Sequence, residues 1–175
     1  MSHQQHDLVY VEVGGIDPSL NNWGMSKGFY DLDEGKLTMT DLSISQPKGK
    51  EKRKNLTDLH KAFMHSYTMG DFFNNPKPHI VFAELPIGSQ SARAMASYGV
   101  CIGVIGALQV NTTVIALTPA AIKLACTGDK DASKEEMMRW AENTYPHLPW
   151  PRKADGSLIK GKAEHMADAC GAIHH

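Results

Sequence analysis

The stretch LVYVEVGGIDPS, residues 8–19, decides the fold because an apolar run rich in valine reaches a carboxylate at Asp17. Such a run is typical of a buried strand. The segment HIVFAE, residues 79–84, repeats this pattern and ends on a second acid, Glu84. A buried carboxylate without a cation costs several kcal/mol. The sequence therefore predicts two buried strands that carry Asp17 and Glu84 towards a bound cation.

A third acidic residue, Asp168, lies in the helical stretch MADACGAI, residues 166–173, with no Lys or Arg beside it. His165 precedes Asp168 by three positions, so both side chains share one helix face. If this helix packs across the sheet, the two side chains face the strand carboxylates Asp17 and Glu84. A divalent metal ion is the simplest cation to offset their charge.

The remaining pattern predicts one α/β domain, residues 1–175, with a five-stranded mixed sheet flanked by helices. An antiparallel meander of three strands, turning at 31–36, precedes helical crossovers that make the first, fourth and fifth strands parallel. Residues 1–6 are expected to be a disordered tail, and the Pro-rich segment 146–162 a mobile loop. The expected strands are 8–16, 24–32, 36–44, 79–84 and 112–117; the expected helices are 55–72, 90–108, one from Pro119 to Gly128, one from the capping box at Ser133, and a last one from Ala163 with Met166, Ala167, Cys170 and Ile173 on its apolar face.

Composition limits the class of protein. The chain has 175 residues, of which 42% are hydrophobic, enough for one domain with a sizeable core. No apolar run approaches the roughly 20 residues of a membrane span, and no secretory leader is seen, so the expected location is the cytoplasm. The three cysteines, Cys101, Cys126 and Cys170, are expected to be reduced core residues.

The net charge of −1 by itself argues against a nucleic-acid partner, but the positive charges are clustered. Local patches set the electrostatic field that a ligand meets, whatever the total charge. A solvated helix start explains the first cluster equally well, so both interpretations stay open. The first cluster contains Lys48, Lys50, Lys52, Arg53, Lys54 and Lys61, and the second contains Arg152, Lys153, Lys160 and Lys162.

Four motifs together resemble those of the RuvC Holliday-junction resolvases, including phage-type members, in the same order and over nearly the whole chain. The resemblance implies an RNase H-like fold of the retroviral-integrase superfamily, a homodimer, and metal-dependent cutting of branched DNA in a bacterial or phage-infected cell. The motifs are GIDPS at 15–19, FAE at 82–84, TPAAIK at 118–123 with Thr127-Gly128 and Ser133-Lys134, and HMADA at 165–169.

The resemblance also assigns residues. It implies two Mg²⁺ or Mn²⁺ ions, which suit phosphodiester hydrolysis because hard oxygen ligands hold them. Many members have Asp where this chain has His165. The imidazole could supply a nitrogen ligand that manganese accepts, or act as an acid or base. It could also be simply a surface histidine. The implied catalytic and metal-binding residues are Asp17, Glu84, His165 and Asp168; the predicted DNA-binding residues are Lys123, Lys134, Lys48, Lys50, Lys52, Arg53, Lys54 and Arg93.

The helix expected at 90–108 carries a stripe of small residues, although each glycine in a helix costs about 1 kcal/mol. Another part of the protein, or a second molecule, must therefore pack closely against this helix. One interpretation is tight packing on the protein's own sheet, and the other, which the resemblance favours, is a two-fold dimer contact. The predicted interface residues are Ala92, Ala96, Gly99 and Gly103, with Gly106 in the same stripe.

The predicted function is a structure-selective endonuclease, a crossover junction endodeoxyribonuclease that nicks symmetric strands of a Holliday junction as a dimer. The segment 85–90 is shorter than in typical bacterial members and lacks their aromatic residue, which weakens the expectation of a stacked wedge. A relaxed debranching nuclease acting on forks and flaps is therefore one alternative. A non-catalytic junction-binding protein on the same fold is another, and a small phosphotransferase of the actin and sugar-kinase superfamily is a distant third.

Overall fold

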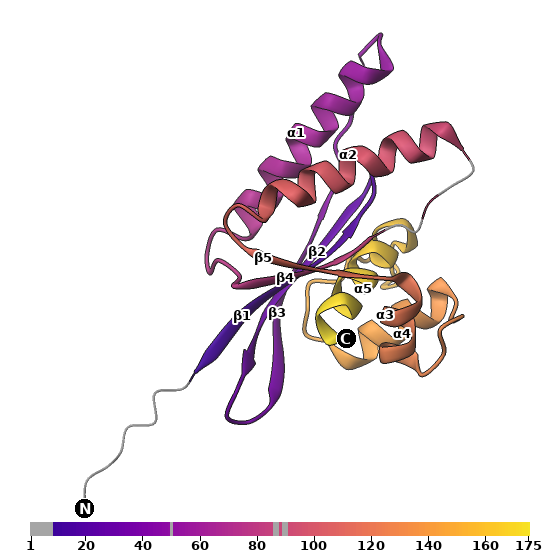
Figure 1. The fold of residues 1–175 in the computed structure, drawn as a ribbon. Helices are drawn as coiled ribbons and strands as arrows, with labels where there is room; N and C mark the ends of the chain where they lie inside the picture. The colour runs from indigo at the N-terminus through magenta and orange to yellow at the C-terminus, as the bar shows by residue number, and fades with distance from the viewer. Residues whose placement is uncertain (1–8, 50, 86–87, 89–90) are drawn as a thin grey trace, which may run out of the picture.

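The computed structural model describes residues 9–49, 51–85, 88 and 91–175, so the predicted tail at 1–6 lies outside it. Five strands form one sheet in the order β3-β2-β1-β4-β5 (Figure 1). β1 pairs antiparallel with β2, and β2 with β3, whereas β1–β4 and β4–β5 are parallel pairs. This confirms the predicted mixed sheet. The strands are β1 (Tyr10–Pro18), β2 (Trp23–Asp31), β3 (Lys36–Ser45), β4 (Ile80–Glu84) and β5 (Thr113–Leu117).

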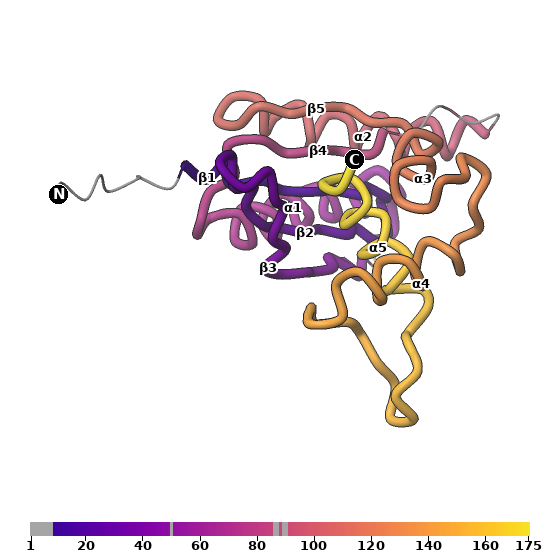
Figure 2. The backbone as a smooth tube through the Cα atoms, turned by 90° about the horizontal axis from the view of Figure 1, so that it is seen from below, coloured from indigo at the N-terminus to yellow at the C-terminus, as the bar shows by residue number. Residues whose placement is uncertain are grey.

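Helices cover both faces of the sheet, as Figures 1 and 2 show together. α1 and α2 pack on one face, and α5 crosses the other, where α3 and α4 pack against it. No helix in the described ranges has the length and apolar character needed to cross a membrane. The helices are α1 (Lys54–Phe72), α2 (Ala92–Leu108), α3 (Pro119–Thr127), α4 (Lys134–Thr144) and α5 (Lys160–His174).

Local sequence signals explain where the later helices begin and end. The hydroxyl of Thr118 accepts a hydrogen bond from the Ala121 amide, and Pro119 follows as the first helical residue of α3. α3 ends at Gly128, whose φ of 77° is a left-handed conformation that glycine adopts without strain. Ser133 and Glu136 form the expected capping box of α4. These boundaries follow directly from the sequence.

The helix α5 is more deeply buried than its predicted apolar face implies. Besides the expected residues of that face, the structure also buries Ala169, Gly171 and Ala172. The reason is that α5 lies between the sheet and the pair α3 and α4, which covers most of its surface between Ala163 and Ile173. The three cysteines carry no disulfide, and Cys101 and Cys170 are buried, as expected for reduced core residues.

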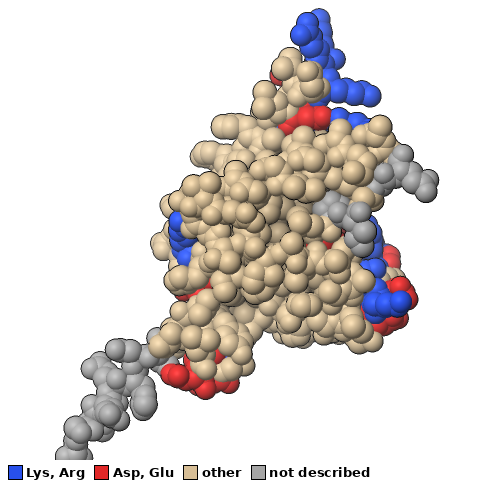
Figure 3. Space-filling model, viewed as in Figure 1, with Lys and Arg blue, Asp and Glu red and all other residues tan. Residues whose placement is uncertain are grey.

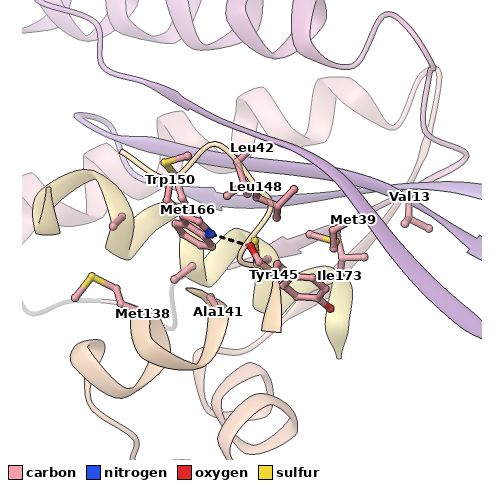
Figure 4. Packing of buried hydrophobic residues seen from close by; sticks show 13 residues of the cluster. Val13, Met39, Leu42, Met138, Ala141, Tyr145, Leu148, Trp150, Met166 and Ile173 are labelled. Carbon is pink, nitrogen blue, oxygen red and sulfur yellow. Dashed lines mark hydrogen bonds between the residues drawn. The ribbon is translucent and has the colours of Figure 1, made fainter. Parts of the chain in front are cut away.

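The segment 146–162 is not the mobile loop that its composition indicated. Leu148 and Trp150 are buried in the core beneath α5 (Figure 4), and the Trp150 indole donates a 2.9 Å hydrogen bond to the Tyr145 carbonyl. A bridge between Arg152 and Leu158 then closes the exposed tip. Most of the segment stays irregular, but burial of two large apolar side chains anchors it to the core.

Candidate active site

Two glycines let α5 approach the sheet closely enough to build a site. A Cβ atom on Gly15 would lie 2.1 Å from the Ala169 carbonyl oxygen, and one on Gly24 would lie 2.0 Å from the His165 carbonyl oxygen. The Ser26 hydroxyl fixes the crossing by donating a 2.7 Å hydrogen bond to that Ala169 oxygen. Side chains larger than hydrogen at the two glycine positions would push α5, and with it His165, away from the strands.

The four predicted catalytic residues lie near one another at the carboxyl ends of β1 and β4. Asp17 lies near the end of β1 and Glu84 ends β4, and these parallel neighbours finish on the same side. α5, which crosses the sheet, places His165 and Asp168 near these strand ends. The Nδ1 atom of His165 lies 2.5 Å from Oδ2 of Asp17, and their side chains are only 15% and 11% exposed. Residues far apart in sequence thus form one partly buried, polar cluster.

The electrostatics of the cluster are those of crowded carboxylates. Burial, followed by repulsion from Asp17 and Asp168, raises the pKa of Glu84 to about 8. Burial and then repulsion from Asp17 raise the pKa of Asp168 to about 7. Negative charge in this cluster is therefore only partly compensated, and a bound cation would relieve it.

His165 experiences opposing effects. Burial acts to lower its pKa, but the hydrogen bond to Asp17 and the nearby negative charges outweigh that effect, so the pKa is raised overall. The imidazole is held between carboxylates and carries a positive charge more readily than a free histidine does. In this arrangement it shares the charge-balancing role that a bound cation would take.

Lys123 and Lys134 lie near this cluster, and their predicted contact with DNA stays a prediction. Both lysines act to lower the pKa of Glu84 and of Asp168, which places their positive charges near the carboxylates. Lys134 also donates a 3.1 Å hydrogen bond from Nζ to the carboxylate of Glu164. The candidate site therefore has an acidic centre with a basic edge, an arrangement suited to a phosphate group that reaches a cation.

The donor set fits magnesium or manganese in chemical type. Three carboxylates and one imidazole supply the hard oxygen ligands that Mg²⁺ prefers and the nitrogen that Mn²⁺ accepts. Among the residues described, no three acidic, histidine or cysteine side chains already converge as a complete metal-binding group. One oxygen of the Asp17 carboxylate, Oδ2, already contacts His165.

A second basic region lies at the projecting start of α1. Figure 3 shows Lys and Arg side chains gathered at this tip, whereas acidic side chains gather over the β2–β3 turn at the opposite end. The exposed residues of the tip are Lys48, Lys52, Arg53 and Lys54, and the fifth predicted residue, Lys50, lies outside the described ranges.

Arg93 has a partner within the protein. Its guanidinium forms a bidentate ion pair with Asp58 of α1, in which Nη2 lies 2.6 Å from Oδ1. Planar two-point contacts of this kind are among the stronger ion pairs. Arg93 therefore ties the start of α2 to α1, and its predicted role in DNA binding remains a prediction.

The small-residue stripe on α2 faces away from the sheet. Ala92, Ala96, Gly99 and Gly103 are exposed, and a Cβ atom added to Gly99 or Gly103 would meet no atom within 4 Å. Packing on the protein's own sheet therefore does not explain these glycines. The outward face of α2 also exposes Met95 and Ile102, at 47% and 45%.

Sequence reasoning missed the residues that support the site. Gly15, Gly24 and Ser26 determine how closely α5 approaches, and Glu164 contacts Lys134. The paired register of Gly15 with Ser26 and of Asp17 with Gly24 was available once a hairpin was assigned, because small residues there mark a close approach. No sequence signal distinguished Glu164 from a solvated surface acid.

Comparison with solved structures finds this fold in Holliday junction resolvases. RuvC of Thermus thermophilus aligns with a TM-score of 0.66 at 20% identity, over 94% of this chain and 93% of that chain. The same resolvase in complex with Holliday junction substrate gives 0.69 at 20% identity, over 94% and 92%. The yeast mitochondrial Holliday junction resolvase Ydc2 gives 0.60 at 13% identity, over 93% and 77%. No protein-family model and no curated protein matches the sequence. The protein thus has the RNase H-like fold of the RuvC resolvases.

Proposed function

We propose that this protein is a metal-dependent endonuclease that cuts branched DNA, with four-way junctions as its preferred substrate. The observation that carries the proposal is the contact of His165 with Asp17, with Glu84 and Asp168 close enough to repel Asp17, at the ends of β1 and β4. Two of these acids have strongly raised pKa values, which is typical of functional sites. The shared fold with junction resolvases supports the substrate class.

The four residues would hold one or two Mg²⁺ or Mn²⁺ ions. Bound ions of this kind supply Lewis-acid chemistry, activating water and stabilising the leaving oxygen of the phosphodiester. The protein's own part is to hold the carboxylates in position, to orient His165 through Asp17, and to limit access of bulk water. A protein that only bound DNA would gain nothing from buried carboxylates, because they repel phosphate.

Two basic surfaces would receive the DNA. Lys123 and Lys134 border the acidic cluster and would attract the phosphate that is to be cut. The exposed tip of α1 would contact a more distant part of a branched substrate through the backbone phosphates, which bind without reading sequence. Two separate basic surfaces that contact only backbone phosphates suit recognition of the shape of a DNA branch.

The outward face of α2 would form a homodimer contact. Exposed small residues at Ala92, Ala96, Gly99 and Gly103 would let two helices approach closely, and the exposed Met95 and Ile102 would be buried between them. A two-fold axis through this contact would give the dimer two equivalent sites for the two symmetric strands of a junction.

The test uses purified protein with four-way junction, fork, flap and duplex substrates of matched sequence, in magnesium, manganese or chelator. The proposal expects symmetric nicks in the junction that require metal, with weaker cutting of forks and flaps. Equal cutting of junctions, forks and flaps supports the alternative of a relaxed debranching nuclease. Tight junction binding without cutting in either metal supports the non-catalytic alternative.

A further inference from the structure

Two ion pairs of opposite polarity join the N-terminal parts of α4 and α5. Lys134 Nζ lies 3.1 Å from Glu164 Oε2, and Lys160 Nζ lies 3.4 Å from Glu135 Oε1. The pairs differ in burial, because the Glu164 side chain is 23% exposed and that of Glu135 is 58% exposed. Exposed pairs contribute little to stability. The Glu135 pair is therefore a natural control for the Glu164 pair.

The carboxylate of Glu164 divides its two oxygens between two residues of the candidate site. Oε2 accepts the hydrogen bond from Lys134, whereas Oε1 lies 3.6 Å from Nε2 of His165. The second distance is too long for a direct hydrogen bond but short enough for attraction between opposite charges. The other ring nitrogen of His165 meets Asp17, so this ring lies between two carboxylates.

We propose that Glu164 is a positioning residue of this site, an inference that rests on the proposed nuclease function. Glu164 holds the Lys134 ammonium beside the acidic cluster. It also attracts the His165 ring through Nε2, on the side opposite Asp17. The Lys134 side chain is 66% exposed, and a long exposed lysine samples many rotamers unless it is anchored. An anchored ammonium meets the incoming phosphate already in place.

The same negative charge has an opposing effect on DNA binding. Glu164 competes with phosphate for Lys134 and repels the DNA backbone, so it weakens binding while it improves the geometry for cutting. Removing its charge should therefore tighten DNA binding and slow cleavage at the same time. A residue that merely stabilises the fold would not separate the two effects in this way.

The experiment compares Glu164→Gln with Glu135→Gln, wild type and Asp17→Asn. Two readouts need no catalysis: the imidazole resonances of His165 in metal-free protein, and the affinity for a four-way junction in chelator. The third readout is single-turnover cleavage at saturating junction in magnesium or manganese. Asp17→Asn tests the nuclease function separately, because cleavage at the wild-type rate in that variant contradicts the function whatever Glu164 does.

For Glu164→Gln, the inference expects shifted His165 resonances, metal-free junction binding about two- to fivefold tighter, and cleavage slowed about tenfold. Glu135→Gln should match wild type in all three measurements. The inference is overturned if Glu164→Gln leaves the His165 resonances and metal-free affinity as they are in Glu135→Gln. Because these two readouts stand without cleavage, they decide the role of Glu164 even if the wild type cuts no DNA.

Discussion

The Nδ1 atom of His165 lies 2.5 Å from the Oδ2 atom of Asp17, although 147 residues of chain separate the two along the sequence. This contact joins α5 to β1 at the end of the sheet where Glu84 also lies. It depends on a close crossing of α5 over β1 and β2, and on an environment that crowds negative charge. Both conditions lead to measurable consequences.

The close crossing predicts a large effect of Gly24→Ala. The added Cβ would lie 2.0 Å from the His165 carbonyl oxygen, so α5 must shift. We expect a loss of about 2–4 kcal/mol in the free energy of unfolding. Gly70→Ala is the control, because a Cβ there meets nothing within 4 Å and should stabilise α1 by about 0.5–1 kcal/mol. Thermal or urea unfolding measures both, and equal stability of the two variants would contradict the described crossing.

Much of this arrangement follows from the sequence, for physical reasons that differ between elements. The periodicity of the strands, the Thr118 and Ser133 caps and the two strand-end acids predicted the sheet topology and the grouping of Asp17 with Glu84. Such signals are local or repeat along the chain, so they can be read without coordinates.

The features that sequence reasoning missed depend on contacts between distant segments. Trp150 is buried by α5, although its own neighbours are Pro-rich, and Arg93 is engaged by an aspartate of another helix. Glu164 is recognisable only once Lys134 lies beside it. Tertiary burial decides each of these, and a single sequence gives no measure of it.

Charge crowding predicts how the stability of the metal-free protein changes with pH. Glu84 and Asp168 have folded-state pKa values of about 8 and about 7, above the ordinary values of 4.5 and 3.8. The folded state therefore binds more protons than the unfolded state in this range, and stability falls as pH rises from about 4 to about 8. Glu84→Gln should weaken this dependence and gain roughly 1–3 kcal/mol at pH 8.

Unfolding in chelator at several pH values measures this prediction, with the exposed turn variant Glu34→Gln as control. If the two variants follow the same curve, Glu84 is not in a crowded, buried environment. Added Mg²⁺ or Mn²⁺ should restore stability to the wild type at pH 8 more than to Glu84→Gln, because the metal binds the ionised carboxylates.

The predicted dimer depends on Gly103. Gly103→Leu should give a monomer, since the leucine side chain would separate two closely packed α2 helices. The same substitution should not disturb the fold of the subunit, because no atom lies within 4 Å of the added Cβ. Sedimentation measures the change, with Gly161→Leu, at the exposed start of α5, as a control. An unchanged dimer in Gly103→Leu would place the contact elsewhere.

His165 should give cleavage a characteristic pH dependence. An imidazole ligates metal only when it is deprotonated, and Asp17 raises the pKa of His165 above its ordinary value of 6.5. Activity should therefore fall as the pH drops from the alkaline side through the raised pKa of His165. His165→Asp should keep activity and lose the histidine-linked step, whereas His165→Ala should lose most cleavage.

The comparison is a pH–rate profile of wild type and both variants in each metal. His165→Asp should also use magnesium at least as well, relative to manganese, as the wild type does, because it restores a set of hard ligands. Coincident profiles for all three proteins would make His165 a bystander, with Asp17, Glu84 and Asp168 forming the site.

The most direct test of the account is strand-specific nicking of a four-way junction by wild type and Asp17→Asn, at equal protein concentration in magnesium or manganese. Asp33→Asn, in the exposed β2–β3 turn, is the matched control. The account predicts paired symmetric nicks by wild type and Asp33→Asn, and at least a hundredfold slower nicking by Asp17→Asn, on the order of losses seen for essential catalytic groups, with junction binding retained or tightened. Nicking by Asp17→Asn at the wild-type rate would contradict it.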